Sequence, residues 1–587
     1  MWLLRRPFDR GCLRHPRIAP WAALPVAAVV LAAITIGVTW PLFRHPATQV
    51  LDSPSLYGPA SELVQRDINL TVWTLAWDSR ALVTDPLHLF HANVFYPARW
   101  SLALTEHMLG NVPTFGPVYL ATGNPVLAHQ AALLATFVIA GLAMAAYLDH
   151  WTHDRVAALA GGCLFAFAPF RLWQLGNLHV ISVHWLPLVL LGIDLTLDGR
   201  RRAGAALLAA ALGISSLCSY YVGYATFALG GAYGVAALTS RRREAVAALP
   251  ALGLGFLAAA LAVVVVTIPY LMLQRQGVLP DRERVEDLTS MAFLWLAISG
   301  PRTFTTYFVT PLRDGIPQFL GYAVMGLALV GLVLHRRAPR GALLAGGFTG
   351  WVLALGPVLS FGDGRQLSLP YRWLMAIVPG FSAMRVPQRF GVLATVAATA
   401  LAGLGLAALR ARFAPRGLSG AVTALAIVVV GVALFEARTP GLRTIPMPVG
   451  PSMPAAHRWL AEHGDGGALI EVPTAAEAPL LQSIAMYHST AHWLPTANGY
   501  AAYVPATFVA IMGAAAELPD AGALDRLLAT APLRWVLVRW RLVGRVNQPA
   551  WRTTFDAAGL RVAADFDEMT VFEVPPERRN AVPPANN

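Results

Sequence analysis

Acidic residues gather near the start of the chain, where a carboxylate could serve as a general base. Six of them lie between positions 52 and 107: Asp52, Glu62, Asp67, Asp78, Asp85 and Glu106. A carboxylate at a low-dielectric boundary gains a higher pKa, which suits it to take a proton from an acceptor hydroxyl. Asp67, beside Asn69, is the first candidate for this base, and Glu106, followed by His107, is the second. Structural ion pairs or a packing role for Glu106–His107 are the alternatives.

The spacing in residues 61–83 predicts a helix with two distinct faces. At about 100° per residue, Asp67, Thr71, Thr74 and Asp78 fall within roughly 60° of one another. Leu70, Trp73 and Trp77 form a neighbouring aromatic face. This pattern favours a helix at the membrane surface, where indole rings sit at headgroup level, over an ordinary surface helix with a solvated face. Asp78 and Asp85 are expected to be structural, Asp85–Pro86 as the start of a turn.

A base that activates an acceptor hydroxyl would suit the transfer of a sugar from a lipid-linked donor. Such a transfer also needs positive charge to stabilise the departing phosphate. Four arginines in later loops could supply it: Arg302, Arg372, Arg385 and Arg389. Lipid snorkelling or carboxylate pairing is the alternative for these residues. His179, Tyr220 and Tyr221 are candidates to line a sugar pocket, together with Arg171, Gln174, Asn177 and His184. A metal at Asp67, Glu106 and His107 is conceivable, but no tight ligand spacing requires one, so the cofactor stays open.

Apolar segments dominate the elements that must position these residues. The chain has 587 residues, of which 56% are hydrophobic and 13% charged, which is typical of a polytopic α-helical membrane protein. About eleven transmembrane helices are predicted, and they make residues 1–437 a membrane domain. Their approximate bounds are 21–43, 126–148, 156–170, 185–197, 203–217, 221–238, 246–271, 319–334, 341–361, 390–409 and 418–435. Residues 111–122 are the segment where a further element is expected.

Arginine clusters predict the orientation of these helices. They lie at the N-terminus and after predicted spans two, four, six, eight and ten, which favours a cytoplasmic N-terminus, with the first span retained as an anchor. Three long loops (44–125, 274–317 and 362–388) and the C-terminal domain then share the outer face of a bacterial inner membrane. The net charge of +12 is therefore explained by the membrane topology and by attraction to anionic lipid, and not by nucleic-acid binding.

Two absences exclude other chemistry. All 44 basic residues are arginine, which rules out a Schiff-base lysine and a P-loop lysine. The three cysteines have no zinc or disulfide spacing.

The composition changes after residue 437, where a proline-rich linker begins. Helices are expected at 455–463 and 551–558, and strands at 468–472, 534–539 and 570–574. The sequence therefore predicts an extracytoplasmic α/β domain over 438–575 and a disordered tail over 576–587.

Several strings resemble bacterial membrane proteins of the GT-C glycosyltransferase superfamily. They are Arg66-Asp-Ile-Asn-Leu-Thr-Val-Trp-Thr-Leu-Ala-Trp-Asp78, Ala92-Asn-Val-Phe-Tyr-Pro97, Thr105-Glu-His-Met-Leu-Gly-Asn111, Gly123-Asn-Pro-Val-Leu-Ala128, Phe167-Ala-Pro-Phe-Arg171, Ser219-Tyr-Tyr221, Pro379-Gly-Phe-Ser-Ala-Met-Arg-Val-Pro-Gln-Arg-Phe390 and Asn498-Gly-Tyr500. The resemblance implies a GT-C-like fold, a polyprenyl-phosphate sugar donor, and an acidic residue of the first outer loop at the site. Carried over, that residue is Asp67, with Glu106 as the second acid.

Together these observations favour a membrane glycosyltransferase that moves a sugar from a polyprenyl-phosphate donor to a glycan, lipid or protein acceptor. Two alternatives remain open: a transporter or flippase for a lipid-linked glycan, and a non-catalytic scaffold in envelope assembly. A transporter would be expected to bury acids in the middle of its spans. Asp194 and Glu436 are the intramembrane acids of this sequence, and both are near span ends.

Overall fold

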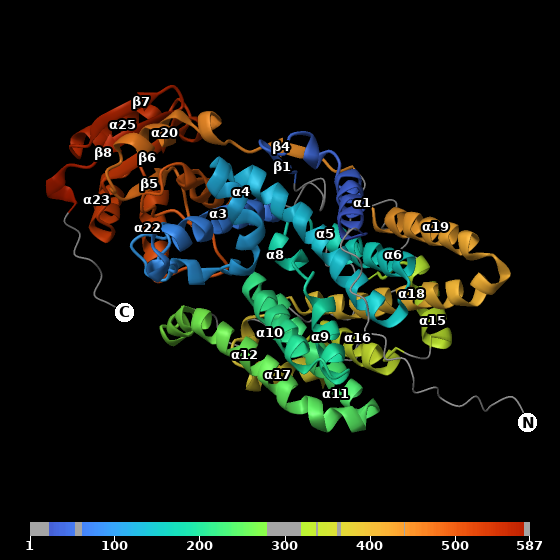
Figure 1. Cartoon of the computed structure of the whole chain (residues 1–587). Coiled ribbons are helices and arrows are strands. Elements are labelled where there is room, and N and C mark those ends of the chain that lie inside the picture. Colours follow the sequence, from blue (N-terminus) through green and yellow to red (C-terminus); the bar gives the residue numbers. More distant parts are fainter. Residues whose placement is uncertain are drawn as a thin grey trace, which may run out of the picture.

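A bundle of apolar helices forms most of the molecule (Figure 1). The computed structural model describes residues 23–52, 62–278, 319–335, 338–360, 365–384, 386–438 and 441–579. A described helix lies in each of the eleven predicted segments. These helices are α1 (Ala23–Val38), α5 (Pro125–Thr152), α6 (Arg155–Ala166), α9 (Leu186–Leu197), α10 (Arg201–Cys218), α11 (Tyr220–Ser240), α12 (Arg242–Arg275), α15 (Tyr322–Leu334), α16 (Arg340–Ala354), α18 (Val392–Phe413) and α19 (Ser419–Ala437).

Seven helical segments of the described chain are long and apolar enough to cross a membrane. Burial along the helices fits this setting. The central part of α18 is buried among other helices, whereas α12 turns large apolar side chains such as Leu254, Leu261 and Val265 outward. Outward-facing leucine and valine on a long helix are expected where the solvent is lipid. The predicted class, a polytopic α-helical membrane protein, is confirmed.

The first loop, between α1 and α5, contains the long helix α3 (Glu62–Thr84) and the shorter α4 (Val112–Thr122). Both helices were predicted, but the expected surface position of α3 is wrong. Its polar stripe is buried, with Thr71, Thr74 and Asp78 each 0% exposed. Trp73 and Trp77 stack on each other with ring centroids 6.4 Å apart and are also buried. The reason is that α21 (Pro479–His488), from the far end of the chain, packs on this helix.

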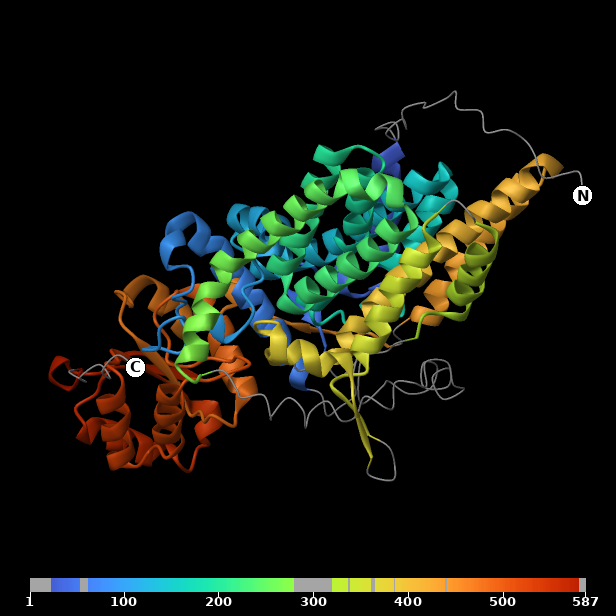
Figure 2. The ribbon, with the colours of Figure 1, turned by 90° about the horizontal axis from the view of Figure 1, so that it is seen from below.

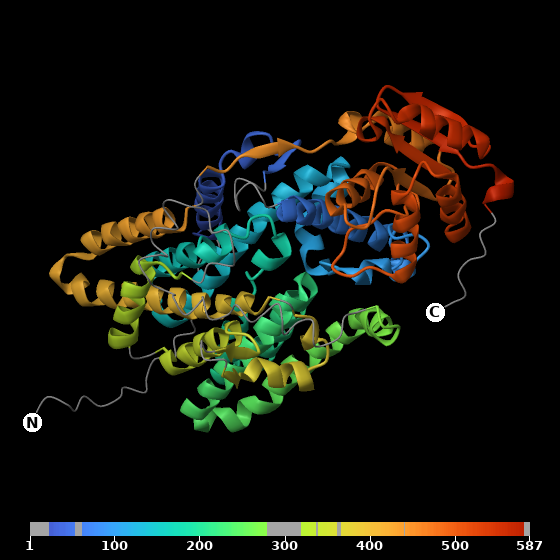
Figure 3. The same cartoon turned by 180° about the vertical axis from the view of Figure 1, so that it is seen from behind.

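A mixed four-stranded sheet organises the C-terminal unit, residues 441–579 (Figure 3). Its strands follow the order β5 (Leu469–Val472), β6 (Trp535–Arg539), β8 (Met569–Glu573) and β7 (Arg561–Phe566). β5 and β6 are parallel, and the other pairs are antiparallel. The helices are α20 (Ala455–His463), α21, α22 (Ala506–Ala516), α23 (Ala521–Thr530), α24 (Trp540–Val543) and α25 (Gln548–Ala557).

Three strands and α20 lie within about one residue of their predicted bounds, and α25 covers most of 551–558. β7 and helices α21 to α24 were not predicted. Of the predicted tail, residues 576–578 form a short 3-10 helix, and residues 580–587 lie outside the described residues. The domain bounds themselves stay a prediction.

The first loop and the C-terminal unit are joined by backbone pairing. β1 (Gln49–Leu51) pairs antiparallel with β4 (Thr444–Pro446), which lies in the predicted proline-rich linker. Further on, Val94 bridges to Thr496, and the Phe95 N–H donates to the Asn498 carbonyl at 3.2 Å. Segments some 400 residues apart in the chain therefore form one continuous structure.

The predicted ninth span is shorter than expected. α16 ends at Ala354, and residues 358–360 instead form β2 (Val358–Ser360), which pairs with β3 (Gln366–Ser368). This hairpin extends away from the helices (Figure 2), and α17 (Pro370–Ile377) follows it. Most of the predicted second outer loop, residues 279–318, lies outside the described residues.

Candidate active site

The segment 105–111 positions Glu106 by lying directly against the end of α10. A Cβ atom added at Gly110 would lie 2.5 Å from the Ile214 carbonyl oxygen and 2.6 Å from the Cys218 nitrogen. Only glycine permits so close a backbone approach. Because α11 starts two residues after α10 ends, this contact brings Glu106 to the first turn of α11.

The Glu106 carboxylate is held at the N-terminus of α11. It accepts hydrogen bonds from the Ser219 hydroxyl, at 2.8 and 2.9 Å to its two oxygens, and from the Tyr220 N–H at 2.8 Å. Burial raises the pKa of the Glu106 carboxyl above its ordinary value of 4.5, against the opposing effects of Arg389 and these hydrogen bonds. The side chain as a whole is 19% exposed. A group in this position can accept a proton.

Two further predicted residues lie beside this carboxylate. His179, on the short helix α8 (Leu178–Ile181), places Nε2 3.8 Å from Glu106 Oε2. Arg389, on the 3-10 helix η7 (Pro387–Gly391), interacts electrostatically with Glu106 and lies 4.2 Å above the Tyr221 ring. The Nε atom of Arg389 is buried and has no hydrogen-bond partner among the described residues. An arginine with an unpaired Nε–H near a carboxylate fits an oxyanion ligand such as phosphate.

A close contact with α11 fixes the segment that carries Arg389. The Tyr224 hydroxyl donates to the Pro379 carbonyl at 2.5 Å, and the Tyr224 and Phe381 rings pack edge to face. Gly380 has φ +74°, and a Cβ there would lie 2.8 Å from the Tyr224 oxygen. Glycine is therefore needed both for the backbone conformation and for the close approach.

His107 has a supporting position behind Glu106. It is 2% exposed, and its ring packs against Phe90, Tyr220 and Tyr270. Burial lowers the pKa of His107 to about 3, so the ring is neutral near pH 7. Its Nδ1 accepts a hydrogen bond from the Leu109 N–H at 3.2 Å. His107 thus shapes the turn beside Glu106 and carries no charge.

Asp78 belongs to the surroundings of this site, although the sequence favoured a structural role for it. It is fully buried, and neither carboxyl oxygen has a hydrogen-bond partner in the described part of the chain. Burial raises the pKa of Asp78 well above 3.8. Both Asp78 and Glu106 are close enough to the Tyr270 phenol to interact with it electrostatically. The i, i+4, i+7 and i+11 spacing of the α3 stripe (Asp67, Thr71, Thr74 and Asp78) was the available signal for its buried position.

Asp67 and Asn69 lie elsewhere, against the C-terminal unit. Asp67 Oδ1 accepts a hydrogen bond from the Tyr500 hydroxyl at 3.1 Å, and Asn69 Nδ2 donates to Ser483 Oγ at 3.1 Å. Eleven residues of α3 separate Asp67 from Asp78, a rise of about 16 Å. The two predicted acids therefore have separate surroundings: Glu106 with Arg389, and Asp67 with Tyr500.

The remaining predicted residues differ in position. Arg372 is exposed and donates to Ser368 Oγ at 3.3 Å. Arg302 and Arg385 lie outside the described residues. Arg171 is buried and donates to three backbone carbonyls, which gives it a structural role and not the pocket position considered from sequence. Within the described chain, Asp67, Glu106 and His107 do not form a group able to share one metal ion.

Comparisons with known proteins agree with this architecture. Residues 127–364 match the family described as bacterial membrane protein YfhO. A comparison with curated protein sequences finds no match. Among solved structures, the chain is similar to the arabinofuranosyltransferase AftD from Mycobacteria, with a TM-score of 0.53 and 17% identity. That match covers 94% of this chain, which spans only 40% of the length of AftD.

A second solved structure, ArnT from Cupriavidus metallidurans bound to undecaprenyl phosphate, matches with a TM-score of 0.42 and 13% identity. That match covers 95% of this chain and 98% of ArnT. The chain is therefore a polytopic membrane protein whose fold is similar to that of the arabinofuranosyltransferase AftD.

Proposed function

We propose that the chain is a membrane glycosyltransferase that moves a sugar from a polyprenyl-phosphate donor to a glycan, lipid or protein acceptor. One observation carries the proposal: at the first turn of α11, Glu106 has His179 Nε2 at 3.8 Å and interacts electrostatically with Arg389, each residue coming from a separate segment. A base and a phosphate-binding cation side by side are what this reaction requires.

In the proposed reaction, Glu106 takes the proton from an acceptor hydroxyl as its oxygen attacks the anomeric carbon. The bond between that carbon and the phosphate oxygen breaks, and polyprenyl phosphate leaves with the electron pair. Arg389 stabilises the phosphate charge, while His179 and Tyr221 bound the space beside the two groups. Attack on the face opposite the leaving group inverts the anomeric configuration.

Asp67 is the competing candidate for the base, because the family resemblance points to it. Two observations favour Glu106. Arg389 acts electrostatically on Glu106, whereas Asp67 accepts a hydrogen bond from Tyr500 of the C-terminal unit. In the proposal, Asp67 and Tyr500 belong to the acceptor side of the enzyme.

The test is transfer of radiolabelled sugar from a panel of polyprenyl-phosphate donors, measured for wild type, Glu106→Gln and Asp67→Asn in parallel. Glu517→Gln, at an exposed glutamate that pairs with Arg526, is the matched control. The expected result is label release by wild type and the control, with a loss of about 10²- to 10⁴-fold in Glu106→Gln.

Wild-type turnover in Glu106→Gln with loss in Asp67→Asn would reassign the base. No transfer by any protein, with a full acceptor panel present, would favour the transport or scaffold alternatives. The inner-membrane location and cytoplasmic N-terminus are part of the proposal, and reporter fusions at the C-terminus test that orientation.

A further inference from the structure

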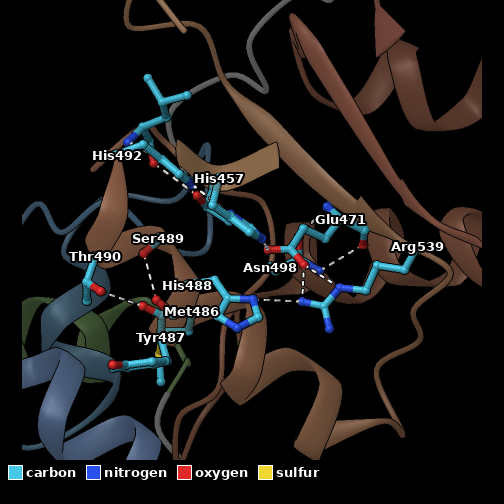
Figure 4. Close-up of polar contacts among 12 residues, drawn as sticks. His457, Glu471, Met486, Tyr487, His488, Ser489, Thr490, His492, Asn498 and Arg539 are labelled. Carbon is cyan, nitrogen blue, oxygen red and sulfur yellow. Dashed lines mark hydrogen bonds and ion pairs between the residues drawn. The ribbon is translucent and has the colours of Figure 1, made fainter. Parts of the chain in front are cut away.

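A compact group of side chains of metal-ligating type lies inside the C-terminal unit (Figure 4). His457 comes from α20, Glu471 from β5 and His488 from the last residue of α21. Their exposures are 0%, 3% and 7%. Three elements thus direct one nitrogen, one oxygen and one further nitrogen to a common point.

The geometry of this group matches a transition-metal site. The three ligand atoms all lie within 4.8 Å of one another. His457 Nε2 and Glu471 Oε1 are 3.4 Å apart. In a tetrahedral site with metal–ligand bonds of about 2.0–2.1 Å, two ligand atoms are about 3.4 Å apart.

The same two atoms are unsatisfied without an ion. Neither His457 Nε2 nor Glu471 Oε1 makes a hydrogen bond with any described residue, although both are buried. Leaving a buried polar atom unpaired costs about 1–3 kcal/mol, so such atoms call for a ligand. A shared cation satisfies both.

Outer contacts hold the ligands in place. The second oxygen of Glu471 accepts hydrogen bonds from Arg539, through Nε at 2.7 Å and through Nη2. The Glu471 N–H donates to Asn498 Oδ1 at 2.7 Å, and Asn498 Nδ2 donates to the Glu471 carbonyl at 3.1 Å. His457 Nδ1 faces His492 Nε2 at 3.4 Å. In metalloproteins, hydrogen-bond partners of this kind orient the side chains that coordinate the metal.

From these contacts we infer that the C-terminal unit binds one divalent transition metal ion of the zinc class through His457, Glu471 and His488. Two histidines and one glutamate are an established donor set for zinc.

The opposing arrangement is a closed, metal-free network. In it, the Leu494 N–H donates to His492 Nδ1, His492 Nε2–H points to His457 Nδ1, and His457 Nε2–H points to Glu471. His488 Nδ1 accepts from Arg539 Nη2 at 3.3 Å. An ion requires the His457 proton to move to Nδ1. His492 must then carry its own proton on Nδ1, so that its Nε2 can accept from His457, and the Leu494 N–H loses this acceptor. The two arrangements therefore predict different metal contents.

The experiment uses the full chain in detergent, free of a polyhistidine tag and stripped with a chelator. Co²⁺ is titrated in, because its visible absorption reports tetrahedral coordination, and bound metal is counted by mass spectrometry. The expected result is one Co²⁺ per chain in wild type and its loss in His457→Gln. His463→Gln, at an exposed histidine on the same helix, keeps the ion.

Size-exclusion chromatography and tryptophan fluorescence check the fold of each variant. If His457→Gln does not fold, His492→Gln decides, since it retains all three ligands and should weaken binding by about 10- to 100-fold. Wild type that binds no more Co²⁺ than His457→Gln, or a His492→Gln variant with unchanged affinity, would overturn the inference in favour of the closed network.

Discussion

Glu106 Oε1 accepts a hydrogen bond from the backbone N–H of Tyr220 at 2.8 Å, across 114 positions of sequence. The first turn of a helix leaves such N–H groups without intrahelical partners and carries partial positive charge. The Glu106–Tyr220 bond therefore joins the first loop to the helix bundle. The partial positive charge at the N-terminus of α11 favours the negative charge of the Glu106 carboxylate. It also fixes the carboxylate relative to Arg389.

The pH profile of transfer should show the ionisation of the Glu106 carboxyl. Burial raises the pKa of Glu106 above 4.5, and a base must be deprotonated to act. As pH falls through that raised pKa, kcat/KM should fall, so the acid limb lies above pH 4.5. The measurement is kcat/KM against pH for wild type and for the residual activity of Glu106→Gln. A wild-type kcat/KM that does not fall as the pH is lowered toward 4.5 would contradict the role of Glu106 as general base.

Arg389→Gln should raise the donor KM by about 10- to 100-fold, because charge-assisted hydrogen bonds to phosphate are lost. It should also move the acid limb to higher pH, since the positive charge of Arg389 lowers the pKa of Glu106. In Arg389→Lys, which keeps a positive charge, the acid limb should move less than in Arg389→Gln. Arg412→Gln, at an exposed arginine near the other end of the adjoining helix α18, is the control and should behave as wild type.

Asp78→Asn should change how stability depends on pH. Burial raises the pKa of Asp78 well above 3.8, so the folded protein retains that proton to higher pH than the unfolded chain. The resulting stability is fully present below about pH 3.8 and is lost as pH rises through the folded-state pKa. Melting temperatures of wild type should therefore fall relative to Asp78→Asn across this interval. Parallel melting curves would disprove the buried, neutral acid.

Gly110→Ala should lower stability by about 1–3 kcal/mol through overpacking, because its Cβ would meet backbone atoms of α10 at 2.5–2.6 Å. The control is Gly213→Ala in α10, where a Cβ meets nothing within 4 Å. That change should stabilise the helix by about 0.5–1 kcal/mol. Thermal unfolding in detergent reports both, and equal shifts for the two variants would contradict the close approach.

Tyr500→Phe should cost about 0.5–1.5 kcal/mol, the net value of one hydrogen bond. Asp67→Asn removes the charge at the other end of the same contact. The double variant should therefore destabilise by less than the sum of the single ones. Additive shifts would show that the two residues act independently.

Much of the bundle could be predicted because an apolar run long enough to span a lipid layer is a local property. α5, α10, α11 and α12 all begin and end within a few residues of the expected bounds. β7 could not be predicted in this way. Its residues are exposed or half-buried without strict alternation, and its place in the sheet depends on pairing with β8.

The candidate site shows the same limit. Glu106, His179, Tyr221 and Arg389 were each candidates from the sequence, but their spacing did not reveal which of them lie next to one another. Asp67 was the first candidate for the base, and its contact with Tyr500 could not be predicted, because it depends on the C-terminal unit packing on α3. Partner choice across hundreds of residues is a tertiary property, which local spacing does not encode.

The pairing of β1 with β4 has a consequence for biogenesis. A ribosome makes β1 early and β4 only after every predicted span has emerged, so the edge of β1 stays unpaired through most of synthesis. The first loop, with the acids it carries, completes its structure last. A chain truncated before residue 444 would insert its helices and still expose an unpaired strand, which marks it for proteolysis.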